Sequence, residues 1–317
     1  MSGLFLGVDT SNYTTSVSCV STEGIVFERR TVLSVPLGER GLRQSDAVFQ
    51  HVRNLPPLIE AMLGAIDPKL VLAVAVSTKP TGSEESYMPV FLAGKLAAVS
   101  IASSMNVPLF ETTHQAGHVR AALLCQEERF TESPFLAMHL SGGTTDLLLV
   151  QHENGLPGDI TRIGGCEDLH AGQFVDRVGV RLGLPFPSGV SLEALARTTE
   201  DRSIKLPASV KTLNCSFSGQ ESQCQRLIEG GAETSAVAYA VYDCMARTFA
   251  KLLTGAFAET GCKTALLSGG VSGSVLLREL LQERLKRELF YAQSGLSSDN
   301  AVGTALLARD LYQKQSR

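Results

Sequence analysis

Hydrophobic and polar positions alternate with the period of β-strands near the start of the chain. Leu4–Val8 is a short apolar run that meets a turn rich in hydroxyl groups, and alternation resumes over Ser16–Val20. Two such runs separated by a polar turn are typical of a β-hairpin. The sequence therefore predicts that the fold opens with two antiparallel strands.

A helical period replaces this alternation further along the chain. Ser45–Ala65 has the spacing of a helix but contains Pro56 and Pro57, so we expect a kinked or split helix there. Leu70–Val76 follows as a predicted buried strand, and an apolar helix is expected over about Pro89–Met105. This order of strands and helices indicates an α/β fold.

The second half of the chain repeats the opening pattern. Phe135–Leu140 is a predicted strand, Ser141–Asp146 a turn of Gly and hydroxyl residues, and Leu147–Val150 the returning strand. A similar hairpin about 130 residues after the first suggests a duplicated fold. The remaining expected elements are a helix near Gly172–Leu184, surface loops at Pro185–Ser191 and Leu206–Ser209, a helix near Ala232–Glu259, a strand at Thr264–Leu267, a Gly turn at Ser268–Gly270, a helix from about Gly273 to Leu289 and a last helix over Asn300–Gln315.

Length and charge narrow the class of protein. The chain has 317 residues, of which 44% are hydrophobic and 19% charged, and its formal net charge is −4. Such a chain can bury a large core and usually has about two domains, so disordered and fibrous classes are excluded. The negative charge argues against a free-standing nucleic-acid binder, because phosphates need clustered Lys and Arg, but it is compatible with a local basic patch.

Cysteine spacing and hydropathy indicate the compartment. Seven cysteines are scattered without a C-x-x-C pair, which supports neither a zinc finger nor a disulfide framework, and we expect them to be reduced. The longest apolar stretches, such as Val71–Val76, are far shorter than the roughly 20 residues of a membrane helix, and the first residues lack signal-peptide features. These observations predict a cytoplasmic protein with no membrane partner.

Gly and hydroxyl residues gather at three predicted strand ends, Asp9–Thr15, Ser141–Asp146 and Ser268–Gly270. Small residues and open backbone N–H groups let a chain approach phosphates closely, so turns of this kind in both halves suggest a nucleotide clamp. Any one turn alone is more typical of an ordinary tight hairpin. The chain has neither a P-loop pattern nor a G-x-G-x-x-G that opens a helix, which argues against P-loop and Rossmann sites.

His114 and His118 are the sharpest local signal of chemistry. On a helix, their i, i+4 spacing puts both imidazoles on one face, within reach of one metal ion. Residue 115 is Gln, so the zinc-protease pattern H-E-x-x-H is missing. The alternative is two solvent-facing histidines one turn apart. Asp299, before the last predicted helix, is a candidate third ligand whose ordinary role would be an N-cap.

Six motifs in matching order make the chain resemble the TsaD family of tRNA threonylcarbamoyladenosine synthases, formerly called glycoproteases, along nearly its whole length. The family's H-x-E-G-H is similar to His114–His118, its V-S-G-G-H-T to Leu140–Thr145, its A-G-E-A-F-D-K to Ala171–Arg177, its F-S-F-S-G to Cys215–Gly219, its G-G-V-S-A-N to Gly269–Ser274 and its T-D-N-A to Ser298–Ala301.

The resemblance implies a fold. It is an α/β, duplicated, two-lobed ATPase fold of the actin, Hsp70 and sugar-kinase class, also called ribonuclease H-like. We expect residues 1–120 to form the N-terminal actin-like lobe and residues 121–317 the C-terminal one. The prediction leaves open that the last helix packs back on the first lobe.

The resemblance also implies a cleft that binds ATP or a threonylcarbamoyl-adenylate beside one divalent iron or zinc ion, with Mg²⁺ as a further candidate. By position, the metal ligands would be His114, His118 and Asp299. His139 is a candidate fourth ligand, the alternative being a histidine hidden in a strand. The nucleotide-binding candidates are His139, Leu140, Ser141, Gly142, Gly143 and Thr144 for the phosphates and carbonyl, Asp176 and Gly189 for the ribose and base, and Gly270 and Ser274.

The implied activity is the transfer of a threonylcarbamoyl, or related carbamoyl, group from an adenylate to the adenosine next to the tRNA anticodon. The metal would polarise the acyl or phosphoryl oxygen, and backbone N–H groups of Ser141–Thr144 would stabilise the developing oxyanion. Asp9 and Thr14, in the first turn, are the candidate catalytic residues. The implied partners are tRNA, bound through a partner complex, and a TsaB-like protein or a second copy.

The chain departs from the family in that first turn. Family members read G-I-E-T-S-C-D-[DE]-T, whereas Tyr13 and Thr14 stand here in place of the paired acids. A hydroxyl cannot replace a carboxylate in proton transfer at neutral pH, because its pKa is far higher. Thr144, Gln173 and Glu221 are further departures, and Glu221 removes a positive charge that could contact tRNA phosphate.

Three functions stay open on the sequence alone. The metal triad and the three turns favour a carbamoyl-transferring enzyme, that is, an acyltransferase. The lost acids favour a nucleotide-binding scaffold or partner protein comparable to the TsaB type, although that type lacks the metal ligands. A metalloprotease is the weakest candidate, because the sequence offers no nucleophile–base pair and no H-E-x-x-H.

Overall fold

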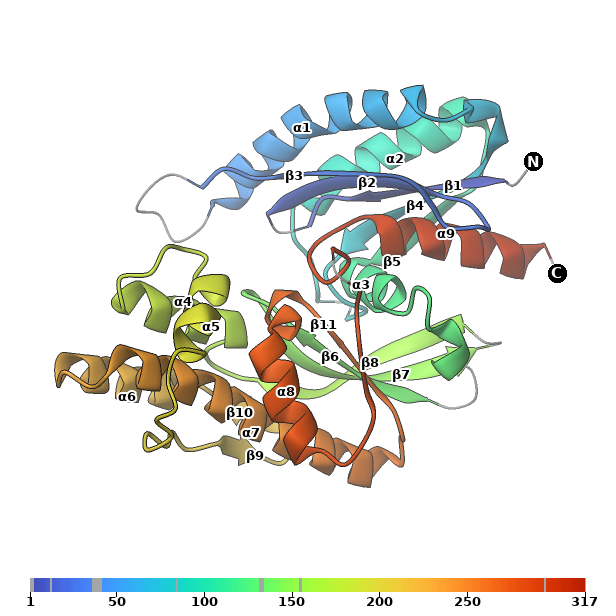
Figure 1. Ribbon diagram of the computed structural model, residues 1–317. Coiled ribbons are helices and arrows are strands. Elements are labelled where there is room, and N and C mark those ends of the chain that lie inside the picture. The colour runs from blue at the N-terminus through green and yellow to red at the C-terminus, as the bar shows by residue number, and fades with distance from the viewer. Residues whose placement is uncertain are drawn as a thin grey trace. The chain divides into compact units, whose positions relative to one another are not determined.

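The computed structural model describes residues 3–316 except 12, 36–41, 84, 131–133, 154–155 and 294. Contacts divide the chain into two units, Met1–Cys125 together with Asp299–Arg317, and Gln126–Ser298. Each unit is built on one β-sheet with helices packed against it (Figure 1). The last helix follows the second unit in sequence and belongs to the first. Among the described residues, no helix combines the length and apolar character needed to cross a membrane.

The first unit contains the strands β1 (Leu4–Asp9), β2 (Thr14–Val20), β3 (Ile25–Val32), β4 (Val71–Lys79) and β5 (Leu109–Thr113), the helices α1 (Gln44–Gly64), α2 (Phe91–Met105), α3 (His114–Ala122) and α9 (Val302–Gln315), and the 3₁₀ turn η1 (Pro68–Leu70). The second contains β6 (Phe135–Leu140), β7 (Thr145–Glu153), β8 (Leu156–Cys166), β9 (Ser209–Lys211), β10 (Asn214–Ser216), β11 (Ala265–Ser268) and β12 (Leu289–Tyr291), the helices α4 (Ala171–Arg181), α5 (Gly189–Ala196), α6 (Ser218–Glu229), α7 (Thr234–Thr260) and α8 (Val275–Arg284), and the 3₁₀ turns η2 (Glu127–Phe130) and η3 (Gly270–Gly273).

The sheet of the first unit has the order β3-β2-β1-β4-β5. The first three strands are antiparallel neighbours, and β4 and β5 run parallel to β1. β1 and β2 are buried along their whole length, because α1 and α2 cover one face of the sheet and α9 the other (Figure 1). The predicted opening hairpin is therefore confirmed, and it lies at the centre of the unit.

The second unit repeats this topology. Its sheet has the order β12-β11-β6-β7-β8-β10-β9, in which β6, β7 and β8 are antiparallel and β11 and β12 run parallel to β6. Five of its strands thus reproduce the order and directions of the first sheet, and β10 and β9 extend it beyond β8. The α/β class and the duplication predicted from the two hairpins are confirmed.

Two local predictions are wrong, and one alternative of a third is excluded. The helix expected to be kinked or split at Pro56 and Pro57 is not split, because α1 runs through both prolines and packing of a buried face outweighs the lost backbone hydrogen bonds. α8 ends at Arg284, and the apolar residues that follow form β12, which pairs with β11. The surface loop expected over Pro185–Ser191 is too long, since α5 begins at Gly189.

Within the first unit, the backbone of α9 lies very close to the backbones of β1 and α3. A Cβ atom at Gly7 in β1 would lie 2.5 Å from the carbonyl oxygen of Ala301, and one at Gly303 in α9 would collide with the carbonyl of Gly117 in α3. Only glycine allows backbones to come this near. The glycines therefore fix the distance of α9 from both β1 and α3.

We expect Gly303→Ala to lower the free energy of unfolding by about 1–3 kcal/mol, because the new methyl group has no space beside the Gly117 carbonyl. Gly64→Ala is the matched control: a Cβ at Gly64, the last residue of α1, would meet nothing within 4 Å. Urea titration should show an unchanged or slightly higher stability for the control. Equal stabilities of the two variants would contradict the close contact of α9 and α3.

Candidate functional site

Helix α3 begins directly at a histidine. The side chain of Thr113, the last residue of β5, accepts a hydrogen bond from the Ala116 N–H at 3.0 Å and caps the helix. His114 and His118 therefore stand one turn apart on the same face, with ring centroids 4.3 Å from each other. The helix that the metal hypothesis requires is present, and the alternative of two solvent-facing histidines is not, since His118 is buried and His114 largely so.

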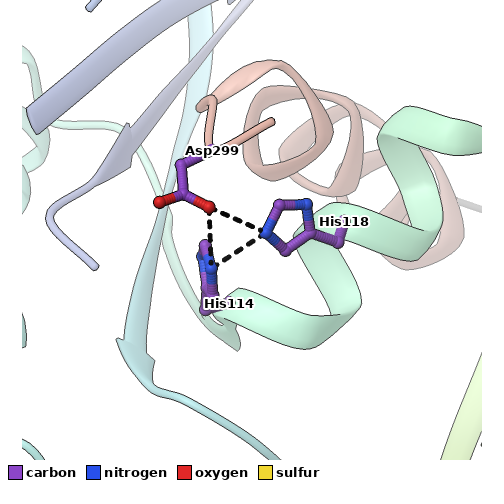
Figure 2. A group of neighbouring side chains, drawn as sticks. All are labelled: His114, His118 and Asp299. Atoms are coloured by element: carbon purple, nitrogen blue, oxygen red, sulfur yellow. Dashed lines mark hydrogen bonds and ion pairs between the residues drawn. The ribbon is translucent and has the colours of Figure 1, made fainter. Parts of the chain in front are cut away.

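Asp299, from the segment that leads into α9, points at both rings (Figure 2). Its Oδ1 lies 3.6 Å from Nε2 of His114 and 3.3 Å from Nε2 of His118, and the two Nε2 atoms are 2.9 Å apart. In the described part of the chain, this is the one group of three or more His, Cys, Asp or Glu side chains that lie close enough together to share an ion. All three belong to the first unit.

The donor set fits a divalent transition metal. Ligands about 2.1 Å from a tetrahedral or octahedral ion are about 3.0–3.4 Å apart, and the three separations lie close to that range. Two imidazoles and one carboxylate suit zinc or iron and leave positions open for a substrate. A hard ion such as Mg²⁺ is a poorer match, because it prefers oxygen ligands.

Asp9 is hydrogen-bonded to the His114 ring nitrogen that faces away from the candidate metal site. Its Oδ2 lies 3.0 Å from Nδ1 of His114, so that Nδ1–H donates to the carboxylate and Nε2 is left for the site. Ser77, at the end of β4, donates to Oδ2, and the hydroxyl and N–H of Ser11 donate to Oδ1. The carboxylate is buried and has four donors, so it positions His114.

Without a metal, the cluster shares protons unevenly. Burial alone would lower the pKa of His114, but the charges and hydrogen bonds of Asp9 and Asp299 raise it to about 10. Burial and the neighbouring charge of His114 lower the pKa of His118. Burial would raise the pKa of the Asp299 and Asp9 carboxyls. The histidines nevertheless hold the pKa of Asp299 well below its ordinary value, and His114 helps to lower the pKa of Asp9. One imidazolium thus sits where a cation would bind.

Asp299 does not cap α9, because the N-cap residue of that helix is Ala301. Helix α9 starts at Val302, whose N–H donates to Oδ1 of Asn300 at 2.9 Å. The Asp299 carboxylate is left to face the histidines, and its backbone carbonyl accepts a hydrogen bond from Nη1 of Arg30 at 3.1 Å.

Thr14 has no hydrogen bond to this cluster in the described part of the chain. It is the buried first residue of β2, its N–H donates to the Ser11 carbonyl at 3.1 Å, and it is paired with Val32. Among the described residues, no hydrogen bond joins its hydroxyl to Asp9 or to the three candidate ligands. The structure therefore joins Asp9 to the cluster by a hydrogen bond, whereas Thr14 is linked to Asp9, within the described ranges, only through Ser11.

In the second unit, the turn after β6 converges with two other segments. Gly143 and Thr144 donate their N–H groups to the Ser141 hydroxyl at 3.2 and 3.1 Å, and the Ser141 N–H donates to the Thr144 carbonyl. A Cβ at Gly172, at the start of α4, would lie 2.7 Å from Gly142, so the helix end touches the turn. Gly269 has a φ of +88° and packs on the Leu140 backbone. Two of the three predicted Gly turns therefore lie side by side.

The other nucleotide-binding candidates lie near the starts of α5 and α8. Oδ1 of Asp176 in α4 accepts the Ser188 N–H at 2.7 Å, which places Asp176 beside Gly189. Burial raises the pKa of this carboxyl. Gly270 opens η3, and Ser274 caps α8 through a bond from the Leu277 N–H at 3.2 Å.

His139 lies in β6, where Nδ1 is 3.2 Å from the Ser268 hydroxyl. It belongs to the second unit and the three candidate metal ligands to the first. The proposal that His139 serves as a fourth ligand stays a prediction.

Sequence reasoning missed the residues that support the cluster. Ser77 could have been found, because β1 and β4 are adjacent parallel strands, and their carboxyl ends meet at one edge of the sheet. Ser11 follows Asp9 by two residues, a spacing typical of an Asx turn. Arg30 gave no signal, since it lies 269 positions from its partner along the chain.

Comparison with known proteins gives a consistent set of relatives. A family model described as tRNA N6-adenosine threonylcarbamoyltransferase matches residues 38–306. A protein of that name from Thermus thermophilus is 30% identical over 98% of this chain and 93% of its own length. One from Neorickettsia sennetsu is 27% identical over 96% of this chain and 92% of its own.

Solved structures agree on the fold at lower identity. The component A of (R)-2-hydroxyglutaryl-CoA dehydratase from Acidaminococcus fermentans has a TM-score of 0.59 at 16% identity, over 100% of both chains. HypF from T. kodakarensis has a TM-score of 0.66 at 14% identity, over 99% of this chain and 48% of that one. A ROK family glucokinase from Streptomyces griseus has a TM-score of 0.55 at 14% identity, over 97% and 100%. The chain therefore has the actin, Hsp70 and sugar-kinase fold.

The raised pKa of His114 makes a prediction about the metal-free protein. The folded pKa is about 10 and the ordinary value 6.5, so the stability that His114 contributes is fully present below pH 6.5 and is lost as the pH rises towards 10. After treatment with a chelator, the free energy of unfolding should fall more steeply between pH 7 and 10 for the wild type than for His114→Gln. Parallel pH profiles of the two proteins would contradict the assignment.

Proposed function

Because the chain belongs to the TsaD family of tRNA N6-adenosine threonylcarbamoyltransferases, we propose that it is a metal-dependent enzyme that transfers a threonylcarbamoyl group from an adenylate to the adenosine next to a tRNA anticodon. The cluster of His114, His118 and Asp299 is the observation that supports metal dependence. The turns of the second unit support the proposal that the donor is an adenylate. The reaction would take place in the cytoplasm, as expected from the sequence.

The first unit's role in this proposal is to hold the metal. His114, His118 and Asp299 would be its ligands, and iron or zinc are the ions that the donors suit. When bound, such an ion supplies a Lewis acid that polarises an acyl or phosphoryl oxygen. Asp9 keeps the His114 proton on Nδ1 and so directs the lone pair of Nε2 to the site. Loading the site therefore releases the proton that His114 otherwise carries on Nε2.

Asp9 acts in this scheme as a positioning residue rather than as an acid or base. Its carboxylate has its oxygens occupied by His114, Ser11 and Ser77, and its lowered pKa keeps it ionised at neutral pH. The missing acids at Tyr13 and Thr14 therefore leave the metal ligands and their support intact. This observation favours an enzyme over a scaffold that has lost its chemistry.

The second unit's role is to bind the nucleotide end of the donor. The N–H groups of Gly143 and Thr144 converge on one oxygen, that of Ser141, which is the arrangement of an anion cradle. A phosphate or developing oxyanion would replace the Ser141 hydroxyl as their acceptor. Asp176 and Gly189 would then meet the ribose and base, and Gly270 and Ser274 would complete the pocket.

The decisive experiment combines metal analysis with a transfer assay. We expect the purified protein to hold one iron or zinc ion per chain and to modify tRNA when given threonylcarbamoyl-adenylate, together with a TsaB-like partner if needed. His114→Ala should lose the metal, and its activity should fall at least 100-fold. Glu60→Ala, at an exposed position of α1, should keep both the metal and the activity. A metal-free protein that still binds ATP would favour the scaffold, and metal without product would rule out the tRNA acceptor.

The nucleotide site has a test of its own. Gly172→Ala should weaken binding of ATP about tenfold or more, because the methyl group would push against Gly142 and displace the turn. Gly219→Ala, near the start of α6, is the matched control, since a Cβ there would meet nothing within 4 Å. Calorimetric titration measures both affinities. Unchanged binding by the Gly172 variant would place the phosphates elsewhere.

A further inference from the structure

We propose that Arg30 is a positioning residue for the metal centre, acting through the backbone of Asp299. This inference rests on the metal site proposed above. It names a residue 269 positions away from that ligand along the chain and on a different element.

The three ligands differ in how firmly their backbones are held. His114 and His118 belong to one helix, so the distance between them is set by the geometry of α3. Asp299 lies outside any helix or strand, three residues before α9 begins at Val302. It is also the first residue after the chain returns from the second unit to the first. Of the three ligands, Asp299 depends most on contacts beyond its own element.

Arg30 supplies such a contact. It lies in β3, where pairing with Ser16 of β2 fixes its backbone within the sheet. Its Nη1 donates to the Asp299 carbonyl oxygen at 3.1 Å, and its Nε lies 3.7 Å from the Glu28 carboxylate on the same strand. The guanidinium therefore ties the carbonyl of the ligand to the edge strand of the first sheet. The Asp299 carboxylate stays free to face the histidines (Figure 2).

An electrostatic role and a positioning role of Arg30 predict opposite effects on metal affinity when its side chain is removed. A guanidinium close to a divalent cation repels it, so a purely electrostatic role means that loss of Arg30 tightens metal binding. A positioning role means the reverse, because Asp299 would sample orientations that do not meet the two imidazoles. Supports of this kind typically change metal affinity by about 10- to 100-fold.

The test is titration of the chelator-treated full chain with Zn²⁺ and with Co²⁺. We expect Arg30→Met to raise the Kd for both ions about tenfold or more and to change the visible absorption of bound Co²⁺, which reports the ligand geometry. Arg29→Met is the matched control: it removes the same charge from the preceding residue, whose guanidinium lies over the Phe27 ring at 5.8 Å. The control should bind both ions like the wild type, and thermal melts of the metal-free proteins should show that both variants are folded.

The outcomes separate the two proposals. Wild-type affinity and spectrum in Arg30→Met, tighter binding, or a loss no greater than in Arg29→Met would overturn the role of Arg30 and leave the metal site standing. A wild-type protein that binds neither ion would overturn both.

Discussion

The close packing of α9 against α3 is the constraint on which the candidate site depends. Gly303 and Gly117 let the two helix backbones touch, and Gly7 lets α9 lie against the central strand β1. A buried ion pair between Arg120 of α3 and Asp310 of α9, with Nε and Oδ2 2.5 Å apart, joins the same helices nearer the end of the chain. Because α9 is fixed in this way, Asp299 arrives beside two histidines that precede it by about 180 residues.

Near that contact, a chain of hydrogen bonds supports the candidate ligands. Asp9 accepts from His114, Ser11 and Ser77 donate to Asp9, and Arg30 donates to the backbone carbonyl of Asp299. A buried carboxylate is costly unless its oxygens are hydrogen-bonded, and here each oxygen has partners. The result is a cluster in which one imidazolium offsets part of the charge of two carboxylates and leaves a net negative charge.

The departures from the family's first turn have less effect on this cluster than the sequence suggests. Tyr13 and Thr14 replace residues that would carry negative charge, but Thr14 pairs with β3 and makes no hydrogen bond to the described ligands. Gln173, another departure, accepts the His170 N–H at 3.2 Å and so helps to start α4. These substitutions change local charge and leave the elements that carry the motifs in place.

The sequence by itself determined the repeated hairpins, the helical spacing of His114 and His118 and the glycine turns, because these are properties of neighbouring residues. It also supplied the family motifs and the candidate third ligand Asp299. Only the tertiary structure decided that α1 continues through two prolines, that Asp299 faces the two histidines instead of capping α9, and that Ser77 and Arg30 support the cluster. Those outcomes arise from packing and from hydrogen bonds between distant segments, whose energies no local pattern of residues records.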